Sequence, residues 1–302
     1  FVFEYPSIST MARHLASLAP RAAVAARPVA SAPRPQLPVL VIGAGMGGLS
    51  FARQLEKAGT SVVVMDAAPR VGGVWRTLAN ASSKLQIDSP AYDFDSTTMP
   101  SPGGHSWRTS FPSQQEILTG CQDMAGSLLG PVYLESRVQA VRKVADAEYE
   151  VTYQRAGRTQ RMRVSGVAAM TGGLHRPRQH TFPGEDAFQG HIGLGISNDT
   201  PLASFQGASV VIVGHGAFAV ENMRTALENG ARHVTLLCRQ QHMVLSTFCN
   251  WLLNSSKGVM PVSDVVSVMR PFYAACGVDV ESLDCLARDA TGEWTMDQST
   301  VP

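Results

Sequence analysis

Two stretches of the chain repeat one pattern of apolar and polar positions. Each begins with a short apolar run, passes through a glycine-rich turn into apolar residues at helical spacing, and ends in a second apolar run. The stretches are Leu37–Asp66 and Val211–Arg239. Short apolar runs beside glycine turns are typical of buried parallel strands. The pattern therefore predicts two strand–turn–helix–strand units, each of the kind that binds a dinucleotide phosphate.

The first unit opens with the predicted strand VLVIG at 39–43 and continues with glycines at G-x-G-x-x-G spacing. Gly43 permits the tight turn, and Gly45 lets a pyrophosphate approach the backbone beside Ala44. Gly48 lets the helix pack closely on the strand. We therefore predict that these four residues bind a dinucleotide.

The helix expected after this loop has Leu49, Ala52 and Leu55 on one face, and Gly59 ends it. The next apolar run ends at Asp66, 23 residues after Gly43. An acid at that distance accepts hydrogen bonds from the ribose of the bound nucleotide. Strand, glycines, helix, strand and acid in this order are much more specific than a glycine turn alone.

The second unit has the G-x-G-x-x-A variant, with Gly214, Gly216 and Ala219. Its helix is expected to pack on the sheet through four apolar residues, which are Ala219, Met223, Ala226 and Leu227.

No acid follows the second strand of this unit, where Cys238 and Arg239 stand instead. An acid would repel the extra phosphate of NADP, whereas the planar fork of an arginine can pair with it. The second unit is therefore predicted to bind NADPH rather than NADH. The alternative is that Arg239 is a surface arginine after a strand.

Between the two units, Glu148–Gln154 and Arg161–Met170 are predicted strands, joined by a polar turn that contains Gly157. The arginines of this region could suggest a phosphate-binding patch. A solvated hairpin explains them better.

Composition narrows the function classes. A chain of 302 residues can form about two domains, and its net charge of +1 provides no overall field for nucleic acid or an anionic membrane. No apolar run approaches the ~20 residues that span a bilayer. The five cysteines form no C-x-x-C pair, and their odd number and wide scatter predict reduced thiols rather than a disulfide framework or a zinc site. No other metal site is expected. Three of them, Cys249, Cys276 and Cys285, are expected to be buried.

The first 36 residues form a separate segment. From Met11 this segment holds four arginines and many alanines, and no acid occurs between Met11 and Glu56. That composition predicts a mitochondrial or plastid transit peptide; the alternative is a disordered leader on a cytoplasmic protein. Because the chain starts with Phe1, we expect an incomplete chain. The predicted domains are 37–200 and 201–302, without a complete return to the first domain.

Shortly after Asp66 comes APRVGGVW, at 68–75. This stretch resembles the NADPH-dependent flavin monooxygenases, of the flavin-containing and Baeyer–Villiger types. The resemblance implies that the first unit binds FAD and that Gly73, Val74 and Trp75 lie near the flavin. Glycines let a chain pass close to a flavin, and an indole can cover its apolar face.

The resemblance extends to further positions. In KLQIDSPAYDF, at 84–94, it implies that Gln86 and the catalytic candidate Asp88 contact the flavin or the nicotinamide. The alternative for Asp88 is a surface Asp-Ser-Pro turn. A small β-meander is implied around Val138, which would meet the adenine. Thr171 and Gly172 match the segment that returns to the FAD site.

The family fingerprint F-x-G-x(3)-H-x(3)-F/W is incomplete in this chain. Phe188 and Gly190 fit it, but Leu194 stands at the histidine position and the final aromatic residue is absent. His191, three residues early, has the alternative role of a polar linker residue. This departure leaves the branch of the family open.

Together these observations predict an α/β protein with two Rossmann-like dinucleotide-binding domains, the first with a small β-meander. The resemblance implies an FAD-dependent monooxygenase that uses NADPH and O₂ to oxygenate a small organic substrate, at nitrogen, sulfur or a ketone, through a flavin hydroperoxide. The alternatives are an FAD-dependent NAD(P)H oxidoreductase without oxygenation, and a degenerate nucleotide-binding fragment without activity. No partner among nucleic acids is expected, and the oligomeric state stays open.

Overall fold

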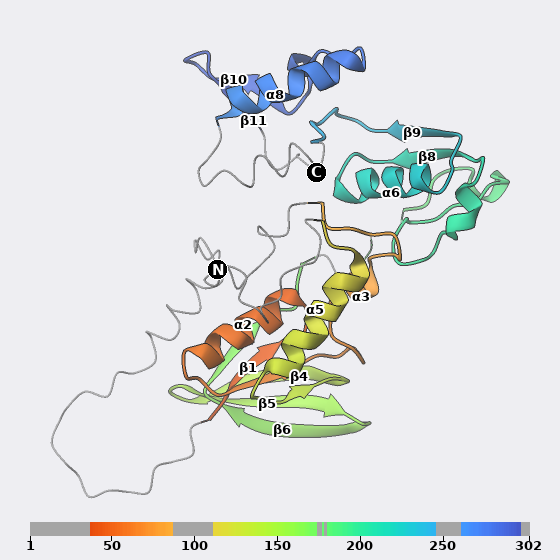
Figure 1. Cartoon of the computed structure of the whole chain (residues 1–302). Helices are drawn as coiled ribbons and strands as arrows, with labels where there is room; N and C mark the ends of the chain where they lie inside the picture. The colour runs from red at the N-terminus through yellow and green to blue at the C-terminus, as the bar shows by residue number, and fades with distance from the viewer. Residues whose placement is uncertain (1–36, 87–110, 174–176, 178–179, 246–260, 297–302) are drawn as a thin grey trace, which may run out of the picture. The chain divides into compact units, whose positions relative to one another are not determined.

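The computed structural model describes residues 37–86, 111–173, 177, 180–245 and 261–296 (Figure 1). The predicted leader at 1–36 and the catalytic candidate Asp88 lie outside these residues. The described residues form two compact units. The first contains 37–78, 115–173 and 177, and the second contains 79–86, 111–114, 180–245 and 261–296. Parallel strands alternate with helices in both, so the predicted α/β class is confirmed.

The first unit is built on a four-stranded parallel sheet in the order β3-β2-β1-β7. Its strands are β1 (Val39–Ile42), β2 (Val62–Met65), β3 (Val132–Tyr133) and β7 (Gly166–Ala169), and its helices are α2 (Met46–Lys57), α3 (Val74–Thr77) and α5 (Gln114–Ser127). The face of α2 predicted to be apolar is buried, with Leu49 and Ala52 fully inaccessible. Both central strands are buried because helices cover one face of the sheet and a second sheet covers the other (Figure 1).

That second sheet is the predicted meander, an antiparallel layer of β4 (Ser136–Ala145), β5 (Glu148–Arg155) and β6 (Arg158–Val164). It packs on the parallel sheet through one cluster of buried residues, which are Leu40, Val63, Met65, Val151, Tyr153 and Val164. The prediction of one strand over Arg161–Met170 is wrong, because the chain changes sheets at Ser165. The Ser165 amide and hydroxyl donate to the carbonyls of Pro38 and Leu37, each at 2.9 Å, and β7 then pairs with β1.

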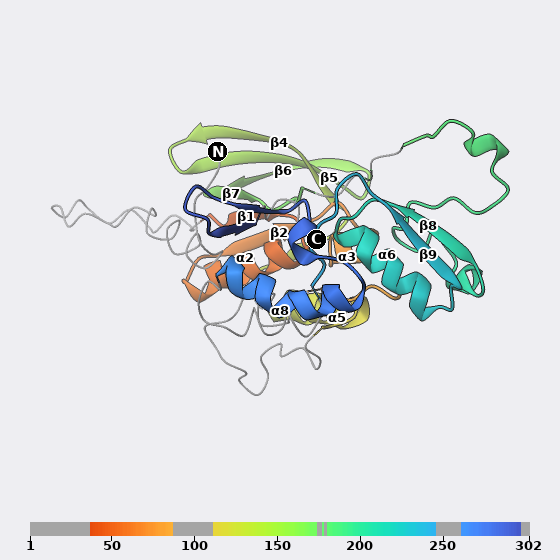
Figure 2. The ribbon, with the colours of Figure 1, turned by 90° about the horizontal axis from the view of Figure 1, so that it is seen from above.

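The second unit contains the repeated strand–helix–strand pattern as β8 (Ser209–Val213), α6 (Ala217–Glu228) and β9 (His233–Leu237). β8 and β9 are parallel, and α6 lies beside them (Figure 2). Ala219 and Ala226 of α6 are buried as predicted, but Leu227 is 53% exposed. The prediction for Leu227 is wrong. The buried face of α6 is formed by small residues such as Ala219 and Ala226, and Leu227 lies outside that face. Two short 3₁₀ turns, η1 (Glu185–Ala187) and η2 (Leu202–Phe205), precede β8.

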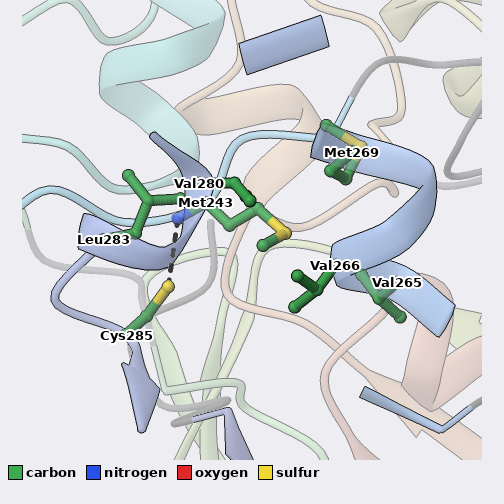
Figure 3. Packing of buried hydrophobic residues seen from close by; sticks show 7 residues of the cluster. All are labelled: Met243, Val265, Val266, Met269, Val280, Leu283 and Cys285. Atoms are coloured by element: carbon green, nitrogen blue, oxygen red, sulfur yellow. Dashed lines mark hydrogen bonds between the residues drawn. The ribbon is translucent and has the colours of Figure 1, made fainter. Parts of the chain in front are cut away.

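The remainder of the second unit contains α8 (Val262–Ala275), the turn η3 (Val280–Ser282) and a hairpin of β10 (Leu286–Arg288) and β11 (Trp294–Met296). These elements share a core that includes Met243, whose amide donates to Cys285 Sγ at 3.3 Å (Figure 3). Cys285 is buried as expected, whereas the same expectation for Cys276 is wrong because this residue is exposed just after α8 ends. Cys249 lies outside the described residues. None of the described helices is long and apolar enough to cross a membrane.

Candidate nucleotide-binding sites

The first glycine loop turns back on itself where β1 ends. Gly43 has φ +113°, and a Cβ placed there would lie 2.4 Å from the carbonyl oxygen of Met170, just beyond β7. A Cβ on Gly48, in the first turn of α2, would lie only 1.9 Å from the carbonyl oxygen of Gly43. Both positions therefore require glycine, and they bring the helix and the two strand ends together at one place.

The Gly-Gly-x-Trp segment packs directly on this loop. The amide of Gly72 donates to the carbonyl of Ala44 at 3.0 Å, and a Cβ on Gly73 would lie 3.1 Å from Gly45 Cα. α3 begins at the next residue, Val74, and contains Trp75. The structure thus brings two separate sequence motifs into one backbone surface without intervening side chains.

The start of α2 is suited to an anion. Gly45 is its N-cap residue, no side chain caps the helix there, and no acid occupies its first turn. The first amides of a helix have no partner within the helix, and their dipoles favour negative charge. The loop therefore fits the pyrophosphate of a dinucleotide such as FAD.

Asp66 connects the end of β2 to the same loop. Its carboxylate accepts hydrogen bonds from the amide of Ala44 at 2.6 Å and from the amide of Ala68 at 2.7 Å. Each carboxylate oxygen carries a second lone pair, so both can accept a further hydrogen bond from a ribose hydroxyl. Asp66 thereby fixes the loop through the backbone. Its contact with a ribose stays a prediction.

We expect Asp66→Asn to weaken both the fold and the binding of FAD. An asparagine can accept one of the two amide hydrogen bonds, but its NH₂ group opposes the other amide. We expect a loss of about 1–3 kcal/mol in the free energy of unfolding, measured by urea denaturation, and a weaker FAD affinity in a fluorescence titration. Asp123→Asn, an exposed position on α5, is the matched control. Equal stability of the two variants would contradict this role.

The other residues predicted for the FAD site occupy two places in the first unit. Thr171 and Gly172 are exposed just after β7, next to the Met170 carbonyl that limits Gly43. Val138 lies on β4 opposite Tyr153, where it packs against the core between the two sheets. Thr171 and Gly172 thus adjoin the glycine loop, while Val138 is part of the meander. The nucleotide contacts of all these residues stay predictions.

The second glycine loop reproduces the geometry of the first. Gly214 has φ +128°, and its amide donates to the carbonyl of Leu237 at 2.9 Å, which ties the ends of β8 and β9 together. Gly216 is the N-cap of α6, again without a side-chain cap or an acid in the first turn. Ala219 is buried below the loop. This loop therefore also fits a dinucleotide phosphate.

Arg239 lies on the same edge of the sheet as the second loop. Val213 pairs with Leu237 at the last position of the parallel ladder, so Gly214 and Arg239 both follow the carboxyl ends of their strands. Arg239 is exposed. Its position and exposure are those needed to meet the 2′-phosphate of a nucleotide bound at this edge.

Sequence reasoning gave no role to a pair of histidines in this unit. His215 lies between the two glycines, and its ring centroid is 5.6 Å from that of His242. In both rings Nδ1 is buried and has no hydrogen-bond partner in the described structure. Burial, and then the nearby His242, lower the pKa of His215 below its ordinary value. The only feature of the sequence that could have indicated this pair is His215, a histidine inside a glycine loop.

The lowered pKa predicts that acid destabilises the protein. Below the unfolded pKa of about 6.5 the unfolded chain binds a proton that folded His215 does not yet bind, so stability falls as pH drops from there toward the folded pKa. We expect the urea midpoint to drop less between pH 7.5 and 5.5 in His215→Asn than in the wild type. His233→Asn, an exposed histidine on β9, is the control. An unchanged pH dependence in His215→Asn would contradict the assignment.

Gln86, predicted to contact the flavin or the nicotinamide, lies in the second unit. Its Nε2 donates to the carbonyl of Ala217, the first residue of α6, at 2.7 Å. In the incomplete fingerprint, Phe188 and Leu194 are largely exposed, and His191 Nε2 lies 3.1 Å from the Thr200 hydroxyl. The exposure of Phe188 and Leu194 and the His191–Thr200 contact are consistent with a polar linker. Among the described residues, no group of three or more potential metal ligands is present.

These two loops define a protein with two dinucleotide-binding folds in series. A family model described as pyridine nucleotide-disulphide oxidoreductase matches residues 40–252, and the chain belongs to that family. The resemblance to flavin monooxygenases is confirmed by its relatives. The chain is 30% identical over 189 residues to a Baeyer-Villiger monooxygenase of Streptomyces coelicolor, and the match covers 61% of this chain and 34% of that protein. It is 24% identical over 212 residues to the FAD-binding monooxygenase VdtE of Byssochlamys spectabilis, covering 68% and 36%.

A solved structure supports the same resemblance to flavin monooxygenases. The chain is similar to OTEMO, crystallised in complex with FAD and NADP, with a TM-score of 0.51 and 26% identity over 69% of this chain and 40% of that one. The predicted pair of Rossmann-like domains is confirmed by this likeness. The chain spans about a third of the length of the two curated relatives named above.

Proposed function

We propose that this chain supplies the two nucleotide-binding units of an FAD-dependent monooxygenase that uses NADPH and O₂ to oxygenate a small organic substrate. The observation that carries the proposal is the pair of glycine loops, each at an uncapped helix start on the carboxyl edge of parallel strands. The first is joined to a Gly-Gly-x-Trp turn and an acid, and the second is followed by an arginine.

The residues of the chain divide the work between the two loops. Ala44, Gly45 and Asp66 would hold the pyrophosphate and ribose of FAD, and the turn at Gly73 would let its ring pass close to the backbone. Gly214, Gly216 and Arg239 would hold NADPH by its phosphates. Bound FAD would accept a hydride from NADPH and activate O₂. The role of the protein is to bind and orient the two nucleotides.

Disulfide chemistry, which the family description includes, has no support among the described residues. All four described cysteines are free. Burial raises the pKa of Cys121 to about 12, against the opposing charge of Arg76, so this thiol stays protonated and unreactive. The second candidate function is therefore a plain FAD-dependent NAD(P)H oxidoreductase, favoured by Leu194 in place of the fingerprint histidine.

An oxygen balance distinguishes the two candidates. The FAD-loaded protein is mixed with NADPH and O₂ in the presence of a thioether, a tertiary amine or a cyclic ketone, and NADPH consumed, H₂O₂ released and product formed are measured. The monooxygenase proposal predicts product in proportion to NADPH for at least one substrate class. Release of H₂O₂ equal to NADPH consumed with all three would favour the oxidoreductase without oxygenation.

A further inference from the structure

The segment 79–86 directly follows α3 in the chain but packs along α6 in the second unit. Arg224 Nη2 donates to the carbonyl of Ser82 at 2.6 Å, and the Ser82 hydroxyl lies 2.8 Å from the Thr225 hydroxyl. The amide of Lys84 donates to Glu221 Oε1 at 2.9 Å. Three polar residues of α6, Glu221, Arg224 and Thr225, thus hold the backbone and one hydroxyl of this short segment.

Further contacts extend this anchoring to both ends of the segment. The amide of Ala81 donates to Asn198 Oδ1 at 3.0 Å. At the other end Gln86 reaches the carbonyl of Ala217, which directly follows the last glycine of the second loop. The segment therefore runs from the end of α3 to the start of the helix that the second loop caps.

The two contacts that Arg224 and Thr225 make with Ser82 are partly buried. Thr225 is only 1% exposed. Arg224 forms ion pairs with Glu221 and Glu228 on its own helix. Partial burial tends to lower its pKa, but the hydrogen bonds and charges of the two glutamates outweigh this and raise it. The guanidinium is thus fixed by two carboxylates while it binds Ser82, and little conformational freedom remains to be lost at that contact.

We propose that Arg224 and Thr225 are positioning residues for hydride transfer, because they fix the segment 79–86, with Gln86, beside the NADPH loop. The inference rests on the proposed function. The segment carries Gln86, which is predicted to contact the flavin or the nicotinamide, so its anchoring on α6 would hold that side chain in place beside the second loop. Misplacement by about 1 Å can slow a transfer step by roughly 100-fold, so such a restraint has a large kinetic effect.

The first test measures the anchor in the protein without nucleotides. Arg224→Met keeps the helix-forming, apolar stem and removes the hydrogen bonds, and Thr225→Val replaces only the hydroxyl by a methyl group. Amide hydrogen exchange at Ala81 and Lys84 is expected to be at least about 10-fold faster in Arg224→Met. The matched controls are Arg232→Met and Thr235→Val, which change exposed residues of the same unit that do not hold this segment. Unchanged exchange in both anchor variants would overturn the proposal.

The second test measures hydride transfer in the FAD-loaded protein by anaerobic stopped-flow with NADPH. We expect Arg224→Met to reduce the flavin roughly 10- to 100-fold more slowly, Arg224→Lys to recover part of that rate, and Kd for NADP⁺ to stay within about 3-fold because the loop is untouched. Faster exchange with an unchanged reduction rate would overturn the positioning role. An equal loss of NADP⁺ affinity and rate would show a structural role only.

The wild-type protein separates this proposal from the one on which it rests. If wild-type protein binds FAD but NADPH does not reduce it, the proposed function is wrong and the kinetic role of Arg224 is overturned with it. The exchange measurement still decides whether the anchor exists, since it needs neither nucleotide.

Discussion

We expect Gly48→Ala to abolish retention of FAD. The added Cβ would lie 1.9 Å from the carbonyl oxygen of Gly43, and a Cβ cannot approach backbone that closely. Either α2 must move away from β1 or the loop must open, and both changes remove the amides that face the pyrophosphate. Overpacking at such a site costs about 3 kcal/mol of stability. The measurement is the flavin absorbance that stays with the protein after gel filtration, together with a thermal melt.

Gly126→Ala is the matched control for this variant. Gly126 is also a helical glycine of the first unit, in α5, and a Cβ there meets nothing within 4 Å. Alanine is a better helix former by about 1 kcal/mol, so we expect this variant to retain FAD and to melt slightly higher. Full retention of FAD by Gly48→Ala would show that the close packing of helix on loop is not required.

We expect Arg239→Ala to remove the preference for NADPH over NADH. A charge-assisted hydrogen bond is worth about 1.5–3 kcal/mol, so the affinity for NADPH is expected to fall roughly 10- to 100-fold. The affinity for NADH, which lacks the 2′-phosphate, is expected to stay the same. Kd for both nucleotides is measured by anaerobic titration of the FAD-loaded protein.

Arg232→Ala tests whether charge alone explains the result. Arg232 is also exposed, but it precedes β9 and therefore lies at the opposite edge of the sheet from Arg239. We expect it to keep the full preference for NADPH. An equal loss in both variants would indicate a general electrostatic effect, and a preserved preference in Arg239→Ala would show that Arg239 is a surface residue without a nucleotide role.

The first nucleotide unit could be predicted well from the sequence because its signals are local. The strand before Gly43, the apolar face around Leu49 and the acid at Asp66 each follow from spacing within one short stretch. The second loop was predictable for the same reason. The burial of its helix was less predictable. Leu227 fits the apolar spacing of the helix, yet it is exposed because the buried stripe is formed by small residues such as Ala219 and Ala226.

Long-range choices were not predictable. The sheet change at Ser165 depends on hydrogen bonds to Leu37 and Pro38, more than a hundred residues earlier in the chain. The attachment of segment 79–86 to α6 depends on Arg224 and Thr225, which resemble ordinary polar residues of a helix. Likewise, the packing of α8 on the β10–β11 hairpin joins apolar positions whose spacing mixes helix and loop patterns.

We propose that this one chain binds FAD at the first loop and NADPH at the second, so that NADPH reduces FAD. The most direct measurement is the visible absorption spectrum of the purified protein, recorded anaerobically before and after NADPH or NADH is added. We predict a bound-flavin spectrum that bleaches faster with NADPH than with NADH. A colourless protein that takes up no added FAD would contradict the claim.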